Sequence, residues 1–224
     1  MIRIAVDGTA SSGKGTLAKK VAYALGYQYV DTGALYRSVA YVAQQNDIDW
    51  NDEEGLSSLA KSLTFRFRWN QRNLEVYVDN VDVTHSIRTD EVGKGASIVS
   101  AHQNVRDSLL YIQKDFAKSG GVVMDGRDIG TVIMPNAEVK FYVDADIQER
   151  ARRRHKDYVS VGKSISIDQV VEELRNRDNR DKNRKIAPLI MAKDAHLLDT
   201  TNLSIEQAVE RMLKQCAMYL DKMT

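Results

Sequence analysis

A glycine-rich loop near the start of the chain reads Gly8, Thr9, Ala10, Ser11, Ser12, Gly13, Lys14, Gly15 and Thr16. The apolar residues 1–6 predict a strand before it, and the spacing of apolar residues over 14–25 predicts a helix after it. Gly8 and Gly13 permit backbone conformations that turn N–H groups inward around an anion. The helix N-terminus and the Lys14 ammonium add positive charge. We therefore predict that the loop binds the phosphates of a nucleotide.

Position 15 departs from the general form of this loop. A serine or threonine usually follows the lysine, and its hydroxyl binds Mg²⁺. Here Gly15 follows Lys14, and the hydroxyl of Thr16 comes one position later. We therefore expect no direct protein ligand for Mg²⁺, which would be held by nucleotide phosphates and water. The Gly-Lys-Gly-Thr form resembles that of nucleoside monophosphate kinases.

Strand and helix signals alternate on both sides of the loop. Apolar runs predict strands at residues 28–30, 122–124, 139–143 and 195–198. Helical patterns cover residues 34–45, 89–99, 103–118, 146–156 and 167–180. Ser204 and Gln207 resemble a capping box that begins a last helix. This order predicts an α/β fold, a P-loop NTPase-type parallel sheet flanked by helices.

One region interrupts this alternation. Residues 64–69 and 74–78 alternate apolar and polar side chains around the turn sequence Asn-Gln-Arg-Asn at 70–73, which predicts an antiparallel hairpin. Residues 81–84 could add a third strand. We expect a small antiparallel β insertion within about 39–87, forming a side domain of one kinase domain. The core would then comprise residues 1–38, 88–150 and 185–224.

Polar side chains follow four of the predicted strands, namely Asp7, Asp31, Asp125 and Asp144. Open parallel sheets bind ligands at the carboxyl ends of their strands, so the chemistry is predicted to lie at this edge. Residues 31–37 read Asp-Thr-Gly-Ala-Leu-Tyr-Arg, in which Thr32 offers a hydroxyl and Arg37 a bidentate phosphate ligand. The alternative is a helix cap beside a surface arginine.

Residues 125–131 form a more specific pattern, Asp-Gly-Arg-Asp-Ile-Gly-Thr. Arg127 could bind a phosphate, and Asp128 could accept hydrogen bonds from an exocyclic amine. The alternative is a solvated loop closed by an Asp–Arg pair. Uracil would face Asp128 with a carbonyl instead of an amine, and an unpaired buried polar group costs about 1–3 kcal/mol. Asp128 would therefore favour a base that carries an amine at this position.

These motifs, followed by Arg-Asp-Asn-Arg-Asp-Lys-Asn-Arg at 177–184 and Ala-Pro-Leu at 187–189, resemble bacterial cytidylate (CMP) kinases over essentially the whole chain. The resemblance implies that residues 8–16 bind ATP and that Mg²⁺ accompanies it. It implies that CMP is bound by Thr32, Arg37, Ser97, Arg106, Arg127, Asp128, Arg177, Asp181 and Arg184. Some members have serine where this chain has Thr32, and either side chain supplies a hydroxyl.

Two arginine-rich segments lie at residues 150–154 and 175–184, with acidic residues interleaved in the second. Solvated helix faces or a nucleic-acid surface would explain the charge but not the acidic residues. We interpret residues 151–184 as a short lid, with the connection 158–166 closing over ATP. Lys14, Arg127, Arg154 and Arg184 are the predicted catalytic side chains. The acceptor phosphate is itself nucleophilic, so we predict no general base.

Composition sets the remaining expectations. The 224 residues carry a net charge of +1 and one cysteine, Cys216, with no signal peptide and no membrane-spanning run. We expect a cytoplasmic monomer that uses ATP, CMP and dCMP and binds neither nucleic acid nor membranes. The alternatives are a kinase for UMP, AMP or another small acceptor, a P-loop regulatory switch, and an RNA-binding protein. The guanine-recognition motif expected of a GTPase-type switch is missing.

Overall fold

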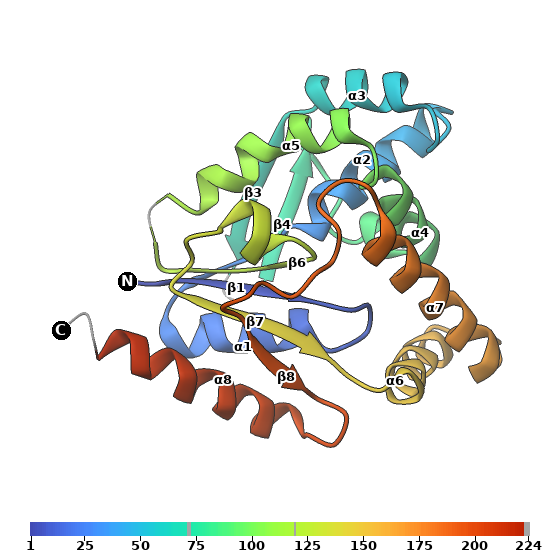
Figure 1. Ribbon diagram of the computed structural model, residues 1–224. Helices are drawn as coiled ribbons and strands as arrows, with labels where there is room; N and C mark the ends of the chain where they lie inside the picture. The colour runs from blue at the N-terminus through green and yellow to red at the C-terminus, as the bar shows by residue number, and fades with distance from the viewer. Residues whose placement is uncertain (71–72, 119, 222–224) are drawn as a thin grey trace. The chain divides into compact units, whose positions relative to one another are not determined.

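The computed structural model describes residues 1–70, 73–118 and 120–221 (Figure 1). The chain forms two compact units, which are described separately. Met1–Gln28 and Gly120–Thr224 form the first unit, and Tyr29–Ser119 form the second. The glycine-rich loop belongs to the first unit.

Parallel strands form the centre of the first unit. They are β1 (Arg3–Gly8), β6 (Val122–Gly126), β7 (Val139–Asp144) and β8 (His196–Asp199). The sheet order is β2-β6-β1-β7-β8, with β2 at Gln28–Asp31. Asp7 of β1 aligns with Gly126 of β6 and with Tyr142 of β7. The carboxyl ends of these three strands therefore meet at one edge of the sheet, as we predict.

Two helices pack beside this sheet. Helix α1 (Lys14–Leu25) contacts β1 and β6, and α8 (Ile205–Leu220) contacts β7 and α1. Gly26 ends α1 in the left-handed conformation. The predicted capping box is confirmed, since Ser204 and Gln207 satisfy each other's backbone N–H groups at the start of α8. The buried Cys216 lies in α8.

Helices α6 (Ile147–Ser160) and α7 (Ile167–Asn183) form a pair within the first unit. They enclose an apolar cluster made of Ala151, Tyr158, Val170, Val171 and Leu174, which also includes Ala10 of the glycine-rich loop. The prediction that the connection begins at residue 158 was wrong. Tyr158 is buried and helical, because its ring packs in this cluster, and the connection spans only residues 161–166.

The second unit combines a small sheet with helices around its own core. Its elements after β2 are α2 (Gly33–Gln45), α3 (Glu53–Ser62), β3 (Phe65–Asn70), β4 (Asn73–Val78), β5 (Val81–Asp82), the 3₁₀ turn η1 (Ser86–Arg88), α4 (Asp90–Val99) and α5 (Gln103–Phe116). The predicted hairpin is confirmed as the antiparallel β3–β4 pair. Residues 71–72 of its predicted turn lie outside the described residues.

Helix α3 was not predicted. Asp52 caps it by accepting the N–H of Gly55, and Glu53 and Glu54 occupy its first turn, where the helix dipole favours negative charge. Leu56 and Ala60 are buried in the core of this unit. The predicted fold class is confirmed, with a five-stranded sheet among helices and a separate three-stranded sheet.

Candidate active site

Two glycines shape the loop between β1 and α1. Gly8 has φ +155°, and a Cβ atom there would lie 2.0 Å from the carbonyl oxygen of Val143. Gly13 has φ +86° at the N-cap of α1, a left-handed conformation that side chains rarely adopt. The loop therefore requires glycine at Gly8 for space and at Gly13 for backbone conformation.

Side chains within the loop fold back onto its backbone. The hydroxyl of Ser12 donates to the carbonyl of Thr9 at 3.0 Å, and the ammonium of Lys14 donates to the same carbonyl at 3.3 Å. Lys14 is thus held over the loop, where its charge can meet phosphate oxygens. Ser11 has a positive φ of 59°, so the loop backbone enters the left-handed conformation at this residue. Such alternation turns successive N–H groups toward one side.

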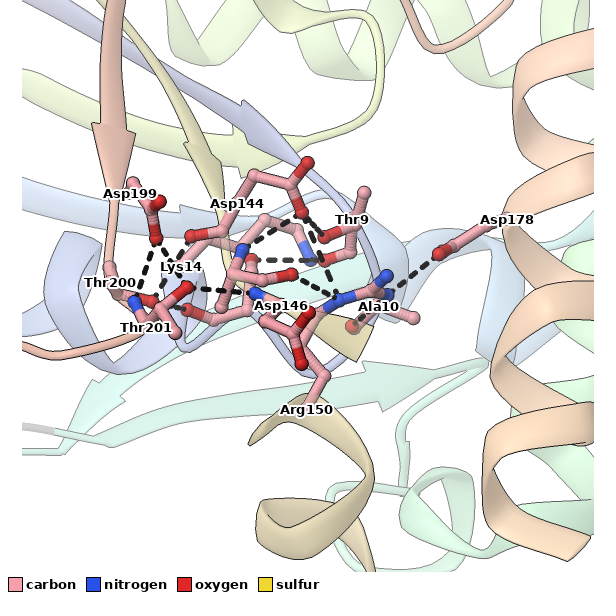
Figure 2. Close-up of polar contacts among 12 residues, drawn as sticks. Thr9, Ala10, Lys14, Asp144, Asp146, Arg150, Asp178, Asp199, Thr200 and Thr201 are labelled. Carbon is pink, nitrogen blue, oxygen red and sulfur yellow. Dashed lines mark hydrogen bonds and ion pairs between the residues drawn. The ribbon is translucent and has the colours of Figure 1, made fainter. Parts of the chain in front are cut away.

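The ends of β7 and β8 support the loop from outside (Figure 2). The Thr9 hydroxyl donates to Asp144 Oδ1 at 2.6 Å. Thr200 donates its hydroxyl to the Ser12 carbonyl at 3.0 Å and its N–H to the Asp144 carbonyl at 2.8 Å. Arg153 donates to the carbonyls of Ser12 and Thr200 at 3.4 and 2.8 Å. Nothing in the linear sequence indicates these contacts, since 188 residues separate Ser12 from Thr200.

A second arginine on α6, Arg150, is buried beside the loop. Its Nη1 donates to the Ala10 carbonyl at 3.2 Å and to Asp178 Oδ2 of α7 at 2.7 Å. Its Nε donates to the Ala145 carbonyl at 2.9 Å. The arginine-rich run was visible in the sequence, but its contact with the loop was not.

The residues after β6 bring together several predicted side chains. Arg127 Nε donates to Asp181 Oδ2 of α7 at 2.7 Å, and Arg184 lies 3.5 Å from Asp128 Oδ1. Burial acts to lower the pKa of Arg127, but the carboxylates of Asp181, Asp125 and Asp178 together raise it above its usual value. Asp128 and Asp181 are both buried. The ion pair with Asp181 holds Arg127 in place as a cation.

Nearby arginines lower the pKa of Asp181 in turn. Burial acts to raise the pKa of Asp181, but Arg127, Arg177 and Arg184 lower it below the usual value of a carboxyl group. Asp181 therefore stays ionised among three predicted substrate-binding cations. The alternative for residues 125–131, a solvated loop closed by an Asp–Arg pair, does not describe that segment, because Asp125 and Asp128 are buried.

Asp7 links the start of the glycine-rich loop to this segment. Its carboxylate is buried and accepts the backbone N–H groups of Ile129 and Gly130, each at 2.7 Å. Burial raises the pKa of Asp7 to about 7, while the two N–H groups act to lower it. These N–H groups open the π-helical turn η2 (Ile129–Ile133), directly after Asp128. Asp7 thereby fixes the backbone that presents Arg127 and Asp128.

Arg154, the remaining predicted catalytic residue, lies on α6 against an aromatic ring. Its guanidinium lies over the ring of Tyr158, 4.6 Å from the ring centroid. A cation above an aromatic face is held without losing its charge. Arg154 therefore lies on α6 on the same side as the apolar cluster of the helix pair.

The second unit holds the other predicted CMP-binding residues. Arg37 donates to Asp31 at 2.5 Å, so it is not a solvated surface arginine. Thr32 is buried at the N-cap of α2 and makes no side-chain capping bond. Arg106 is buried, donates to the Ser100 carbonyl at 3.1 Å and lies over the ring of Tyr36. Ser97 is buried on α4.

The predicted CMP-binding residues thus divide between the units. Thr32, Arg37, Ser97 and Arg106 belong to the second unit, and Arg127, Asp128, Arg177, Asp181 and Arg184 belong to the first. The structure brings Arg127 to Asp181 and Asp128 to Arg184 within the first unit.

The chain is similar to proteins of one known family over nearly its whole length. A family model described as cytidylate kinase matches residues 4–218. The chain belongs to the cytidylate kinase family. A cytidylate kinase of Exiguobacterium sp. is 45% identical over 96% of this chain and 97% of its own length. A cytidylate kinase of Bacillus subtilis is 42% identical over 95% of both chains.

As a cytidylate kinase, the protein phosphorylates CMP. This activity confirms the CMP kinase function that the motifs predict. A gluconokinase structure from Sinorhizobium meliloti has a TM-score of 0.50 at 14% identity, covering 99% of this chain and 94% of its own. At that identity the likeness concerns the fold alone. None of the helices within residues 1–70, 73–118 and 120–221 could span a lipid bilayer.

Proposed function

We propose that the chain transfers the γ-phosphoryl group of Mg²⁺-bound ATP to CMP and dCMP, with the donor in the glycine-rich loop. Two paired cations carry this proposal, Arg127 directly after β6 and Arg184 at the end of α7. Arg127 pairs with Asp181, and Arg184 pairs with Asp128, in the same unit as the loop. Arg127 and Asp128 follow β6, whose carboxyl end lies beside that of β1. We assign the enzyme to the cytoplasm as a monomer, in one domain with core, insertion and lid as predicted.

The donor site uses the loop backbone and Lys14. The N–H groups of residues 8–16 surround the ATP phosphates, and Lys14 neutralises oxygens near the bond that breaks. Arg154 would leave the Tyr158 ring to meet the transferred group when the lid closes. Closure matters because water would otherwise accept the phosphoryl group.

The acceptor site holds CMP by its phosphate and its base. Arg37, Arg127 and Arg184 bind the acceptor phosphate, with Thr32 as a hydroxyl ligand. Ser97, Arg106 and Asp128 read cytosine, and Arg177 and Asp181 hold the sugar and its surroundings. Alignment of two bound reactants contributes on the order of 7–11 kcal/mol to lowering the barrier. The acceptor phosphate attacks directly, so these residues need only orient it and neutralise charge.

The residues around the loop fit Mg²⁺ held by phosphates and water. Gly15 offers no hydroxyl, and Thr16 is exposed. Within 1–70, 73–118 and 120–221, no three His, Cys, Asp or Glu side chains gather as metal ligands. When bound, Mg²⁺ would neutralise negative charge on the phosphates of ATP. The chain's own part is to hold those phosphates with the loop and Lys14.

Asp128→Ala tests the assignment of the base-reading site. We expect kcat/KM for CMP to fall about tenfold to a hundredfold, because an unpaired buried polar group costs about 1–3 kcal/mol. Slow hydrolysis of ATP without CMP should change far less. Diphosphate formation from CMP, dCMP, UMP and AMP, each with ATP and Mg²⁺, is the measurement. Equal losses of both activities would place Asp128 in folding or phosphate binding.

A further inference from the structure

Arg150 joins three parts of the first unit that are far apart in sequence (Figure 2). It contacts the loop through the Ala10 carbonyl, the end of β7 through the Ala145 carbonyl, and α7 through Asp178. Arg150 and Asp178 are each 6% exposed. A buried pair of this kind keeps its geometry because loss of either partner would leave an uncompensated charge.

The side chain of Ala10 makes a second, independent contact with the helix pair. Its methyl group belongs to the apolar cluster between α6 and α7 that includes Tyr158 and Leu174. Ala10 is thus held by the helix pair through both its carbonyl and its side chain. Only this residue of the loop belongs to that cluster among the described residues.

The geometry of the peptide group gives this contact a consequence for phosphate binding. The Ala10 carbonyl and the Ser11 N–H share one planar trans peptide, so they point in opposite directions. Fixing the carbonyl toward Arg150 therefore fixes the N–H away from it. Ser11 also needs this restraint, because φ +59° is unfavourable for a residue with a side chain.

We propose that Arg150 is a positioning residue that orients the Ser11 N–H toward the ATP phosphates and transmits the position of α6 and α7 to the loop. This inference rests on the proposed donor site. Arg150 touches no phosphate itself and acts through the Ala10–Ser11 peptide. Movement of α7 carries Asp178 with it and thereby changes the hydrogen bond that Arg150 gives to the loop.

Arg150→Lys is the first test, because lysine keeps the charge but lacks the guanidinium geometry that bridges both partners. We expect the Kd of ATP, measured by calorimetry without CMP, to rise tenfold or more. The Kd of CMP measured alone should change less than twofold. The rate of ATP hydrolysis relative to the rate of CMP phosphorylation should rise, because the position of α6 and α7 would no longer be transmitted to the loop. Arg152→Lys is the matched control, because Arg152 is exposed and pairs with Glu149 on the surface.

Two further variants keep the test decisive if the lysine variant folds poorly. Ala10→Gly removes the methyl contact but leaves the carbonyl, and should raise the Kd of ATP about threefold. Asp178→Asn removes the charge and retains an acceptor, with Glu172→Gln as the matched exposed control on α7. The Arg150→Lys and Asp178→Asn effects on ATP binding should be non-additive, because both variants break one link.

The outcomes separate this inference from the proposed function. Equal losses of ATP and CMP affinity in the Arg150 variant, or unchanged ATP affinity, would overturn the positioning role. Additive effects of the two changes would overturn the link through Asp178. Failure of the unaltered protein to bind ATP in the loop would instead overturn the proposed donor site.

Discussion

The Asp7 carboxylate shows how a single residue ties two motifs together. It stands directly before Gly8, yet its two hydrogen bonds go to the backbone after Asp128. The sequence indicated only that Asp7 follows a strand. Its partners depend on β1 and β6 lying side by side, which the order of residues along the chain does not specify.

Asp7 predicts a pH dependence of stability. Because its pKa is raised from 3.8 to about 7 in the folded protein, folding takes up a proton between these values. Its contribution is full below about pH 4 and is lost as the pH rises to about 7, by on the order of a few kcal/mol. Urea unfolding from pH 4 to 8 would measure this slope.

The Asp7→Asn variant should lack that component of the slope and be less stable, because its amide group places a donor against a backbone N–H. Asp168→Asn, an exposed change in the first turn of α7, is the control. Parallel pH curves for the unaltered protein and the Asp7 variant would contradict the prediction.

Asp181→Asn tests the pair that holds Arg127. The buried guanidinium would lose its counter-charge, so we expect the free energy of unfolding to fall by about 3 kcal/mol. The Kd of CMP should rise at least tenfold, while ATP binding in the loop stays within about threefold. Denaturant unfolding and separate titrations with each nucleotide would measure this. A change confined to ATP would show that Arg127 serves the donor instead.

At the scale of elements, the tight approach of the loop to β7 is the strictest constraint. Gly8→Ala would place a methyl group 2.0 Å from a backbone oxygen. We expect a loss of more than about 4 kcal/mol or failure to fold. Gly162→Ala is a matched comparison, with φ +77° and no atom within 4 Å of the added carbon. It should cost only about 1–2 kcal/mol. Similar thermal unfolding of both variants would contradict this reading.

The last helix depends on its cap. Ser204→Ala removes the hydroxyl that accepts the Gln207 N–H at 3.2 Å. The expected cost is about 1 kcal/mol, or a Tm lowered by about 2–4 °C in a chain of this size. CMP phosphorylation at 25 °C should be unchanged. Ser164→Ala, an exposed change in the connection between α6 and α7, is the control, and equal Tm shifts would count against the cap.

Secondary structure was predictable where local signals agreed. The residues of α1 and the capping box of α8 follow from glycine, apolar spacing and Ser–Gln pairing. Helix α3 could not be predicted, because it has few apolar residues and the start signal at Asp52 is not followed by a clear helical period. Helix α6 extends to Ser160 because Tyr158 packs against α7, a tertiary contact that composition does not indicate.

At the scale of the whole molecule, the candidate site could be predicted only through four motifs in order. Composition alone, with a net charge of +1, favours no ligand. The motifs predicted the cations and acids, and the pairing of Arg127 with Asp181 follows once α7 packs in the first unit. The support of the loop by Arg150, Arg153 and Thr200 could not be predicted, since each acts on a backbone carbonyl.

The burial of Cys216 in α8 makes the single thiol of this chain a natural reporter. Burial raises its pKa to about 12, so almost no thiolate exists in the folded state at neutral pH. A thiol reagent can then modify it only when α8 separates from the sheet. The rate of modification would measure those openings without an introduced probe. Bound nucleotide would lower the rate by the same factor by which binding reduces the population of the open state.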